Sequence, residues 1–322
     1  MISVTKLLFA RNYFGDNLRY TKTAHKMTSG AAEGVGPVVV WNSTRTCNLR
    51  CRHCYMDSDS RRYNDELSTA EAKKFIDDLA EFKVPVLLFS GGEPLMRADF
   101  FELAEYAANK NIRPTLSTNG TLITPKIAEK IKNIGVGYVG ISLDGLQDVN
   151  DKFRGVEGAF QKAMAGIENC VAVGQRVGLR FTINRHNFEE LDKIFDFIEA
   201  EKINRVCFYH LVYSGRGSKM IDEDLTPLES RAAMDKIIER TKDFERRGLE
   251  KEILTVDNHC DGVYMYLKNL YEGNFETAAQ VKKFISMNGG NRSGIAFGEV
   301  DPAGYVHPDQ FTQHYTFGNV RE

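Results

Sequence analysis

The chain has 322 residues, of which 42% are hydrophobic and 27% charged. This length allows one large domain with an appendage, or two modest domains. With 42 Lys and Arg against 44 Asp and Glu, the net charge is −2, which gives no overall attraction to nucleic acid or acidic membranes. The N-terminal apolar stretch is too short for a signal peptide, and no apolar run approaches a membrane span. The sequence predicts a cytoplasmic protein with no nucleic-acid or membrane partner.

The order of the elements indicates an α/β fold. Residues 1–37 are predicted to be an irregular extension, and from residue 38 to about 250 strand-like and helix-like patterns alternate, as in parallel sheets. The predicted strands are Val38–Asn42, Val86–Ser90, Arg113–Ser117, Tyr138–Leu143, Val177–Ile183 and Arg205–Leu211. Six βα units in succession fit a doubly wound sheet or a partial barrel, and both place their chemistry at the C-terminal ends of the strands.

Four of the intervening helices carry start signals. A cap residue followed three positions later by a glutamate, or directly by a proline, predicts a helix N-terminus. These signals are Ser68 with Glu71, Thr124 with Pro125, Asn187 with Glu190, and Thr226 with Pro227 and Glu229.

The pattern changes after about residue 250. Gly294–Val300 and Tyr305–Phe311 flank the segment Asp301-Pro302-Ala303-Gly304, which predicts a β-hairpin. Residues 251–322 are therefore interpreted as a small C-terminal module that leans on the main domain.

Three of the six cysteines, Cys47, Cys51 and Cys54, fall within eight residues directly after the first predicted strand. In a reducing compartment such a cluster indicates a metal or redox site. Thiolates are the usual ligands of iron–sulfur clusters, and three of them leave the fourth iron of a cubane open. Structural zinc is the alternative, but it needs a fourth ligand, and His53 is poorly placed to supply one. Cys170 and Cys207 are interpreted as small buried hydrophobic residues.

Short polar motifs follow the next predicted strands. Gly91-Gly92-Glu93-Pro94 ends the second strand, Ser117-Thr118-Asn119-Gly120 the third and Ser142-Leu143-Asp144-Gly145 the fourth. The glycines permit close backbone approach to a ligand, and Glu93 offers an acceptor for an ammonium group. Each motif alone is compatible with ordinary turn chemistry, but their repetition at successive strand ends favours a shared ligand site.

The C-x3-C-x2-C spacing and these motifs resemble the radical S-adenosylmethionine (SAM) superfamily over roughly residues 38–250. The resemblance implies a partial (β/α)6 TIM-like barrel and a [4Fe–4S] cluster on the three cysteines. It also implies reductive cleavage of SAM to a 5′-deoxyadenosyl radical, with a reducing donor such as flavodoxin or ferredoxin. The SAM-binding residues it implies are His53, Gly91, Gly92, Glu93, Asn119, Ser142, Asp144, Arg180 and Val212.

The two ends of the chain narrow the resemblance. The segments around Asn17–Tyr20, Asn291–Gly294 and Asp301–Phe311 are similar to the NirJ/AhbC group of haem-biosynthesis enzymes. Members remove acetate or propionate side chains from an iron tetrapyrrole, didecarboxysirohaem, on the routes to haem b or haem d1. The C-terminal module is similar to a SPASM/twitch extension, but without the cysteine-rich tail of many relatives, so a second [4Fe–4S] cluster is doubtful; Cys260 alone cannot hold one.

A tetrapyrrole with several carboxylates calls for arginines and histidines. The predicted substrate contacts are Arg19, Arg292, His307 and Gln310, with His307 as a proton donor or iron ligand and His314 and His25 as further candidates; Arg45 and Arg50 lie in nearby segments.

Two other functions remain open at this stage. A radical SAM peptide maturase usually carries a recognition domain ahead of the barrel, and about 37 residues are too few for one. A non-catalytic iron–sulfur electron carrier would not need the SAM motifs.

Overall fold

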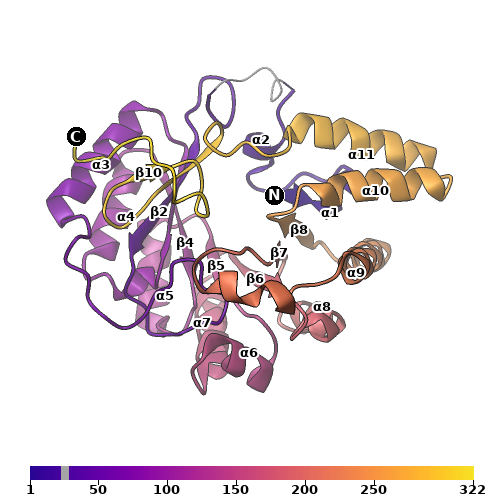
Figure 1. The fold of residues 1–322 in the computed structure, drawn as a ribbon, viewed down its shortest axis with the longest axis horizontal. Coiled ribbons are helices and arrows are strands. Elements are labelled where there is room, and N and C mark those ends of the chain that lie inside the picture. The colour runs from indigo at the N-terminus through magenta and orange to yellow at the C-terminus, as the bar shows by residue number, and fades with distance from the viewer. Residues whose placement is uncertain (23–28) are drawn as a thin grey trace.

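The computed structural model describes residues 1–22 and 29–322, and a single mixed sheet runs through this described part (Figure 1). The strand order is β1-β8-β7-β6-β5-β4-β3-β2-β9-β10. The strands are β1 (Ile2–Ser3), β2 (Val38–Thr44), β3 (Val86–Gly91), β4 (Arg113–Thr118), β5 (Val139–Ser142), β6 (Val177–Ile183), β7 (Arg205–His210), β8 (Glu252–Val256), β9 (Phe297–Val300) and β10 (Val306–His307). Neighbours from β8 to β9 pair in parallel, and β1 and β10 add antiparallel edges.

The sheet is not closed, which makes the fold a partial α/β barrel and confirms the predicted class. The helices lie along the outside of the curved sheet, and α10 and α11 project together to one side (Figure 1). The helices are α1 (Val4–Phe9), α2 (Asp16–Arg19), α3 (Thr69–Glu81), α4 (Phe100–Asn109), α5 (Pro125–Ile134), α6 (Gln147–Arg154), α7 (Ala159–Ala172), α8 (Leu191–Ala200), α9 (Pro227–Arg246), α10 (Cys260–Tyr271) and α11 (Phe275–Asn288). Among the described residues, no helix is both long and apolar enough to cross a bilayer.

Most of the predicted helix starts are confirmed. Ser68 and Thr226 form capping boxes with glutamates three positions later, and Thr124 caps α5 ahead of its first-turn proline. The box predicted at Asn187 was wrong. The Asn187 side chain instead accepts from the Asn184 N–H and donates to the Asp144 carbonyl. It therefore holds the loop after β6, and a 3₁₀ turn, Phe188–Glu190, leads into α8.

The ends of the chain contain more regular structure than the sequence predicted. The N-terminal extension carries β1, α1 and α2, and β1 pairs with β8. The predicted C-terminal hairpin is present as β9 and β10, with β9 parallel to β2. The divisions proposed near residues 37 and 250 are therefore not breaks in the sheet, because strands from all three ranges join it.

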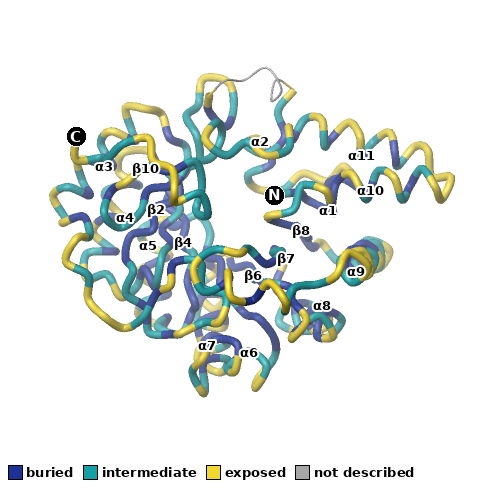
Figure 2. Tube along the Cα trace, in the orientation of Figure 1, coloured by how far each residue is buried: buried dark blue, intermediate teal, exposed yellow. Residues whose placement is uncertain are grey.

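The core lies between the sheet and its outer helices, where buried residues are concentrated on the strands (Figure 2). Strand β2 is among the most buried. Its Trp41, the one tryptophan of the chain, is fully buried, with its ring 5.6 Å from that of Phe75 and 5.5 Å from that of Phe89. β2 leads directly into the cysteine segment, so the packing of β2 in the core fixes the position at which that segment begins.

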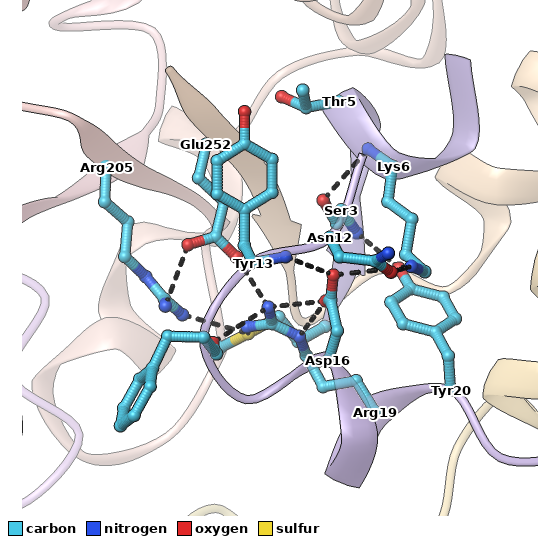
Figure 3. Close-up of polar contacts among 12 residues, drawn as sticks. Ser3, Thr5, Lys6, Asn12, Tyr13, Asp16, Arg19, Tyr20, Arg205 and Glu252 are labelled. Carbon is cyan, nitrogen blue, oxygen red and sulfur yellow. Dashed lines mark hydrogen bonds and ion pairs between the residues drawn. The ribbon is translucent and has the colours of Figure 1, made fainter. Parts of the chain in front are cut away.

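A network of charged side chains fastens the N-terminal segment to the edge of the sheet (Figure 3). The Arg19 guanidinium contacts the carboxylates of Asp16 at 2.7 Å and Glu252 at 2.5 Å, and Arg205 contacts the same Glu252 at 3.0 Å. The Arg19 side chain is only 13% exposed. Arg19 was predicted as a substrate contact, but its carboxylate partners belong to the protein itself.

Because of this network, we expect Arg19 to contribute to the stability of the fold. Hydrogen bonds to charged groups contribute about 1.5–3 kcal/mol. Arg19→Met removes those to Asp16 and Glu252, although Glu252 keeps Arg205 and Asp16 keeps Lys6 as a partner. We expect Arg19→Met to lower the free energy of unfolding by about 1.5–3 kcal/mol in urea titrations.

Arg11→Met is the matched control, because Arg11 pairs with Glu245 at the surface with 44% of its side chain exposed. Such pairs are worth about 0–1 kcal/mol. Equal losses in the two variants would contradict a buried network at Arg19.

Candidate active site

A pocket opens at the C-terminal ends of the parallel strands, where the fold class places its chemistry. Open mouth included, it holds about 1000 Å³ of empty space. Its walls come from strands β3 to β7 and from the loops that follow β2, β7 and β8, and Gln310 and Phe311 close one side.

Cys47, Cys51 and Cys54 all line this pocket. Each sulfur accepts from a nitrogen donor: Cys47 from the Leu49 N–H at 3.4 Å, Cys54 from the Ser58 N–H at 3.4 Å and Cys51 from Arg154 Nη1 at 3.5 Å. Burial raises the pKa of the Cys47 thiol to about 12 and also raises that of Cys51. A bound metal would favour the thiolate form at both positions.

Gly91 and Gly92 line the pocket as predicted, but their close approach is to protein backbone. A Cβ on Gly91 would lie 2.4 Å from the Thr44 carbonyl oxygen, and one on Gly92 would lie 2.3 Å from that of Thr46. The Gly92 N–H donates to the Thr44 carbonyl at 2.7 Å. The two glycines thus let the loop after β3 hold the start of the cysteine segment in place.

Glu93 does not line the pocket. Its side chain is fully buried and accepts from Thr118 Oγ1 at 2.7 Å, the Asn119 N–H at 2.8 Å and the Leu95 N–H at 3.2 Å. Burial raises its pKa to about 7, although these hydrogen bonds oppose the shift. Its carboxylate joins the ends of β3 and β4 through these contacts.

Asp144 is also fully buried behind the pocket wall. One of its oxygens lies 2.6 Å from Arg154 Nη2 and 3.6 Å from His53 Nε2, and the other accepts from the Thr182 N–H. His53 itself lines the pocket and stacks on Phe153 at 4.7 Å. Burial lowers the His53 pKa to about 4, so its imidazole is neutral.

The other residues predicted to bind the cofactor lie on the pocket wall: Asn119, Ser142, Arg180 and Val212. Asn119 donates to Asn48 Oδ1 at 2.8 Å, which connects the motif at the end of β4 to the cysteine segment. Arg180 lies over the Tyr209 ring at 4.9 Å.

The predicted substrate residues are scattered, and of these only Gln310 reaches the pocket, where it donates to Tyr55 Oη at 3.0 Å. His307 is buried in the hairpin, with Nδ1 2.7 Å from the Tyr315 carbonyl oxygen. Arg292 donates to the Gly30 carbonyl at 2.9 Å. His314, Arg45 and Arg50 do not line the pocket, and His25 lies outside the described residues.

The structure adds pocket residues that the sequence reasoning missed, among them Tyr55, Arg154, Thr182, Tyr209, His210, Arg216 and Asp257. His210 ends β7, and its Nε2 lies 2.9 Å from the Asp261 carboxylate. Asp261 is 2% exposed and raises the His210 pKa, against the effect of burial. The position of His210 at a strand end was a usable signal, but its partner on α10 was not visible in the sequence.

A further buried carboxylate supports the pocket through Tyr55. Glu299 on β9 accepts from Asn42 Nδ2 at 2.5 Å, and Tyr55 Oη donates to Asn42 Oδ1 at 2.8 Å. Burial raises the Glu299 pKa to about 9, with Asp301 adding to the shift. Glu299 is therefore protonated near neutral pH, and it fixes the amide that orients the pocket tyrosine.

Residues 41–198 match the model of the radical SAM superfamily. A Fe-coproporphyrin III synthase of Methanosarcina barkeri is 54% identical, covering 100% of this chain and 81% of that protein. A pre-heme d1 synthase of Dinoroseobacter shibae is 41% identical over 98% of this chain and 77% of its own. The chain belongs to the radical SAM superfamily and is a radical SAM enzyme. Within the superfamily it falls in the haem-biosynthesis group that contains these two synthases, which confirms the NirJ/AhbC resemblance.

Solved structures agree with the fold. Streptococcus suis SuiB bound to S-adenosylmethionine superposes with a TM-score of 0.72 at 18% identity, and the match covers 92% of this chain. Native anSMEcpe with bound AdoMet gives 0.68 at 21% identity over 89%. The chain spans 65% of SuiB and 78% of anSMEcpe. At these identities the likeness concerns the fold alone.

The family implies a [4Fe–4S] cluster and SAM, and the donor set fits the cluster. Three sulfurs share one pocket, and each has a nitrogen donor of the kind that surrounds cluster thiolates. Among the described residues, no group of three or more His, Cys, Asp or Glu side chains is arranged around one metal ion. A cubane differs from such a site because its cysteines bind separate irons.

The protonated Glu299 has a consequence for stability. In the folded chain the Glu299 pKa is raised to about 9, whereas an unfolded glutamate loses its proton near the ordinary pKa of 4.5. Stability therefore falls as pH rises through this window, by up to about 1.4 kcal/mol per pH unit for the group. In urea titrations we expect the free energy of unfolding of Glu299→Gln, relative to the native chain, to rise between about pH 6 and about pH 8.

Glu81→Gln, at an exposed position that ends α3, is the control and should leave the pH profile unchanged. Parallel profiles for the native chain and Glu299→Gln would show that Glu299 is already ionised in the fold.

Proposed function

We propose that this enzyme removes the acetate side chains of didecarboxysirohaem to give iron coproporphyrin III. The observation that carries the proposal is 54% identity over the full chain to a protein named Fe-coproporphyrin III synthase. The pocket is compatible with a polycarboxylate substrate, because Arg216 and His210 line it together. Arginine binds carboxylates through paired N–H donors, and an imidazole adds a further donor.

In this proposal Cys47, Cys51 and Cys54 hold the cluster, and SAM lies among His53, Gly91, Gly92, Asn119, Ser142, Arg180 and Val212. The bound cluster and SAM supply the 5′-deoxyadenosyl radical. Glu93 and Asp144 act from behind the wall, where they fix the loops that carry these contacts. Thr182 lines the pocket, and its N–H donates to Asp144. It therefore connects the residues that line the pocket to the buried carboxylate behind them.

The substrate side of the pocket is assigned to Tyr55, Tyr209, His210 and Gln310. His210 replaces His307 as the proposed proton donor, because it lines the pocket and has a buried carboxylate to orient it. Within the described residues, Nε2 binds Asp261 and Nδ1 has no protein partner, which leaves one ring nitrogen for the substrate. Gln310 brings the C-terminal segment into contact with the same site through Tyr55.

We further propose a cytoplasmic setting and a flavodoxin or ferredoxin as the reductant, since cluster reduction requires an electron donor of low potential. No second cluster is proposed. Cys170 and Cys207 are buried as predicted, and the exposed Cys260 stands at the start of α10. Peptide maturation is the weaker candidate, because the likeness to SuiB rests on 18% identity.

The test is anaerobic reconstitution followed by incubation with didecarboxysirohaem, SAM and reductant. Mass spectrometry should show conversion to iron coproporphyrin III together with 5′-deoxyadenosine. Cys51→Ala should abolish both products, since it removes a cluster ligand. Formation of 5′-deoxyadenosine with an unchanged tetrapyrrole would contradict the substrate and spare the enzyme class.

The role of His210 is tested separately by His210→Phe. A positioned proton donor contributes about 10²–10⁴-fold to a rate, so we expect tetrapyrrole turnover to fall at least about 100-fold while 5′-deoxyadenosine still forms. His186→Phe is the matched control, because His186 pairs with Glu223 at the surface with 43% of its side chain exposed. If His210→Phe lowered SAM cleavage and turnover in parallel, His210 would serve SAM rather than the substrate.

A further inference from the structure

The contact between Arg154 and Cys51 joins the end of α6 to the cysteine segment. Arg154 is the last residue of α6, its side chain is 9% exposed, and Nη1 donates to Cys51 Sγ at 3.5 Å. A guanidinium stays protonated under all conditions that proteins tolerate, so the charge beside this sulfur is permanent. The neighbouring sulfurs of Cys47 and Cys54 instead receive uncharged donors: a backbone N–H each, and for Cys47 also the Asn119 side-chain amide at 4.0 Å. The environment of the three sulfurs is therefore asymmetric.

The position of the guanidinium is fixed from several sides. Nη2 lies 2.6 Å from the buried Asp144 carboxylate, whose other oxygen accepts from the Thr182 N–H. The backbone around it is also tied to the cysteine segment: the Arg50 N–H donates to the Arg154 carbonyl and the Arg52 N–H to the Phe153 carbonyl. A Cβ on Gly155 would lie 2.6 Å from the Arg50 carbonyl oxygen, so the two segments are packed at backbone distance.

Positive charge and N–H donors at a cluster sulfur stabilise the reduced state, because reduction adds one negative charge to the cluster. Hydrogen bonds to the sulfurs and local net charge are two of the factors that set the potentials of iron–sulfur clusters. The Asp144 carboxylate acts in the opposite direction, since it places a negative charge behind the guanidinium. Arg154 donates to the sulfur directly, whereas Asp144 contacts Arg154 and is not among the donors to the sulfur, so we expect the cationic effect to dominate.

We propose that Arg154 is a positioning residue that raises the reduction potential of the cluster through its hydrogen bond to Cys51, and that Asp144 orients Arg154 and limits the shift. This inference rests on the proposed ligation by Cys47, Cys51 and Cys54, but not on the identity of the tetrapyrrole. It assigns Asp144 a role toward the cluster, through Arg154, in place of the direct SAM contact that the sequence predicted.

The experiment is an EPR-monitored redox titration of the reconstituted protein without SAM or substrate. Arg154→Met keeps the length of the side chain and removes its charge and donors. We expect the equilibrium constant for one-electron reduction to fall about tenfold or more, which is a potential about 59 mV lower per factor of ten. Asp144→Asn removes the opposing charge and should shift the potential upward. Arg154→Lys keeps the charge and should fall between the native protein and Arg154→Met.

Arg52→Met is the matched control, because Arg52 belongs to the same segment but pairs with Glu223 at the surface with 44% of its side chain exposed. Its potential should match that of the native protein. Iron and sulfide analysis with circular dichroism selects variants that fold and carry a full cluster. A native potential in fully loaded Arg154→Met, or an unshifted or downward-shifted potential in Asp144→Asn, would overturn the inference.

Two further outcomes separate this inference from the proposals on which it rests. A native protein that assembles no [4Fe–4S] cluster would overturn the ligand assignment and the inference with it. Potentials that shift as expected in a protein that leaves didecarboxysirohaem unchanged would support the inference and contradict only the substrate.

Discussion

The parallel register of the central strands is the constraint on which the site depends. Each strand from β2 to β8 points the same way, so the residues that follow each strand meet at one edge of the sheet. Cysteines after β2, glycines after β3 and an imidazole at the end of β7 line one pocket for this reason. These residues are separated by up to about 160 positions in the sequence, and no local contact could bring them together. The parallel topology of the sheet therefore brings the reactive groups together, and short polar segments at the strand ends supply them.

Two buried carboxylates keep these segments in place without facing the pocket. Glu93 joins the ends of β3 and β4, and Asp144 joins the end of β5 to β6 and to Arg154. A fully buried carboxylate is costly unless hydrogen bonds or ion pairs satisfy it, and both oxygens of each side chain have protein contacts. The residues that hold the site rigid are thus distinct from the residues that line it.

Much of the fold and half of the site were predictable from sequence, because both depend on local patterns. Strand periodicity and caps such as Ser68 and Thr226 act over a few residues, and the cysteine spacing is itself a local signal. The predictions for individual site residues were less accurate, because the role of each residue depends on partners that are distant in the sequence. Arg19 was predicted to contact the substrate, but it pairs with Glu252. His307 was predicted to be a proton donor or iron ligand, but it is buried in the hairpin and pairs with the Tyr315 carbonyl. His210 and Arg154 gain their importance from Asp261 and Cys51, which lie 51 and 103 positions away.

The position of β2 also bears on when the site can form during synthesis. β2 carries the cysteine segment, yet it lies between β3, which follows within 50 residues, and β9, whose register pairs Val40 with Glu299. One side of β2 therefore stays without a partner until β9, about 260 residues further along the chain, has been made, and closing a loop of that length is slow. Asn42 gains its contact with Glu299 only at that late stage. The cysteine segment therefore gains this support only after β9 has joined the sheet.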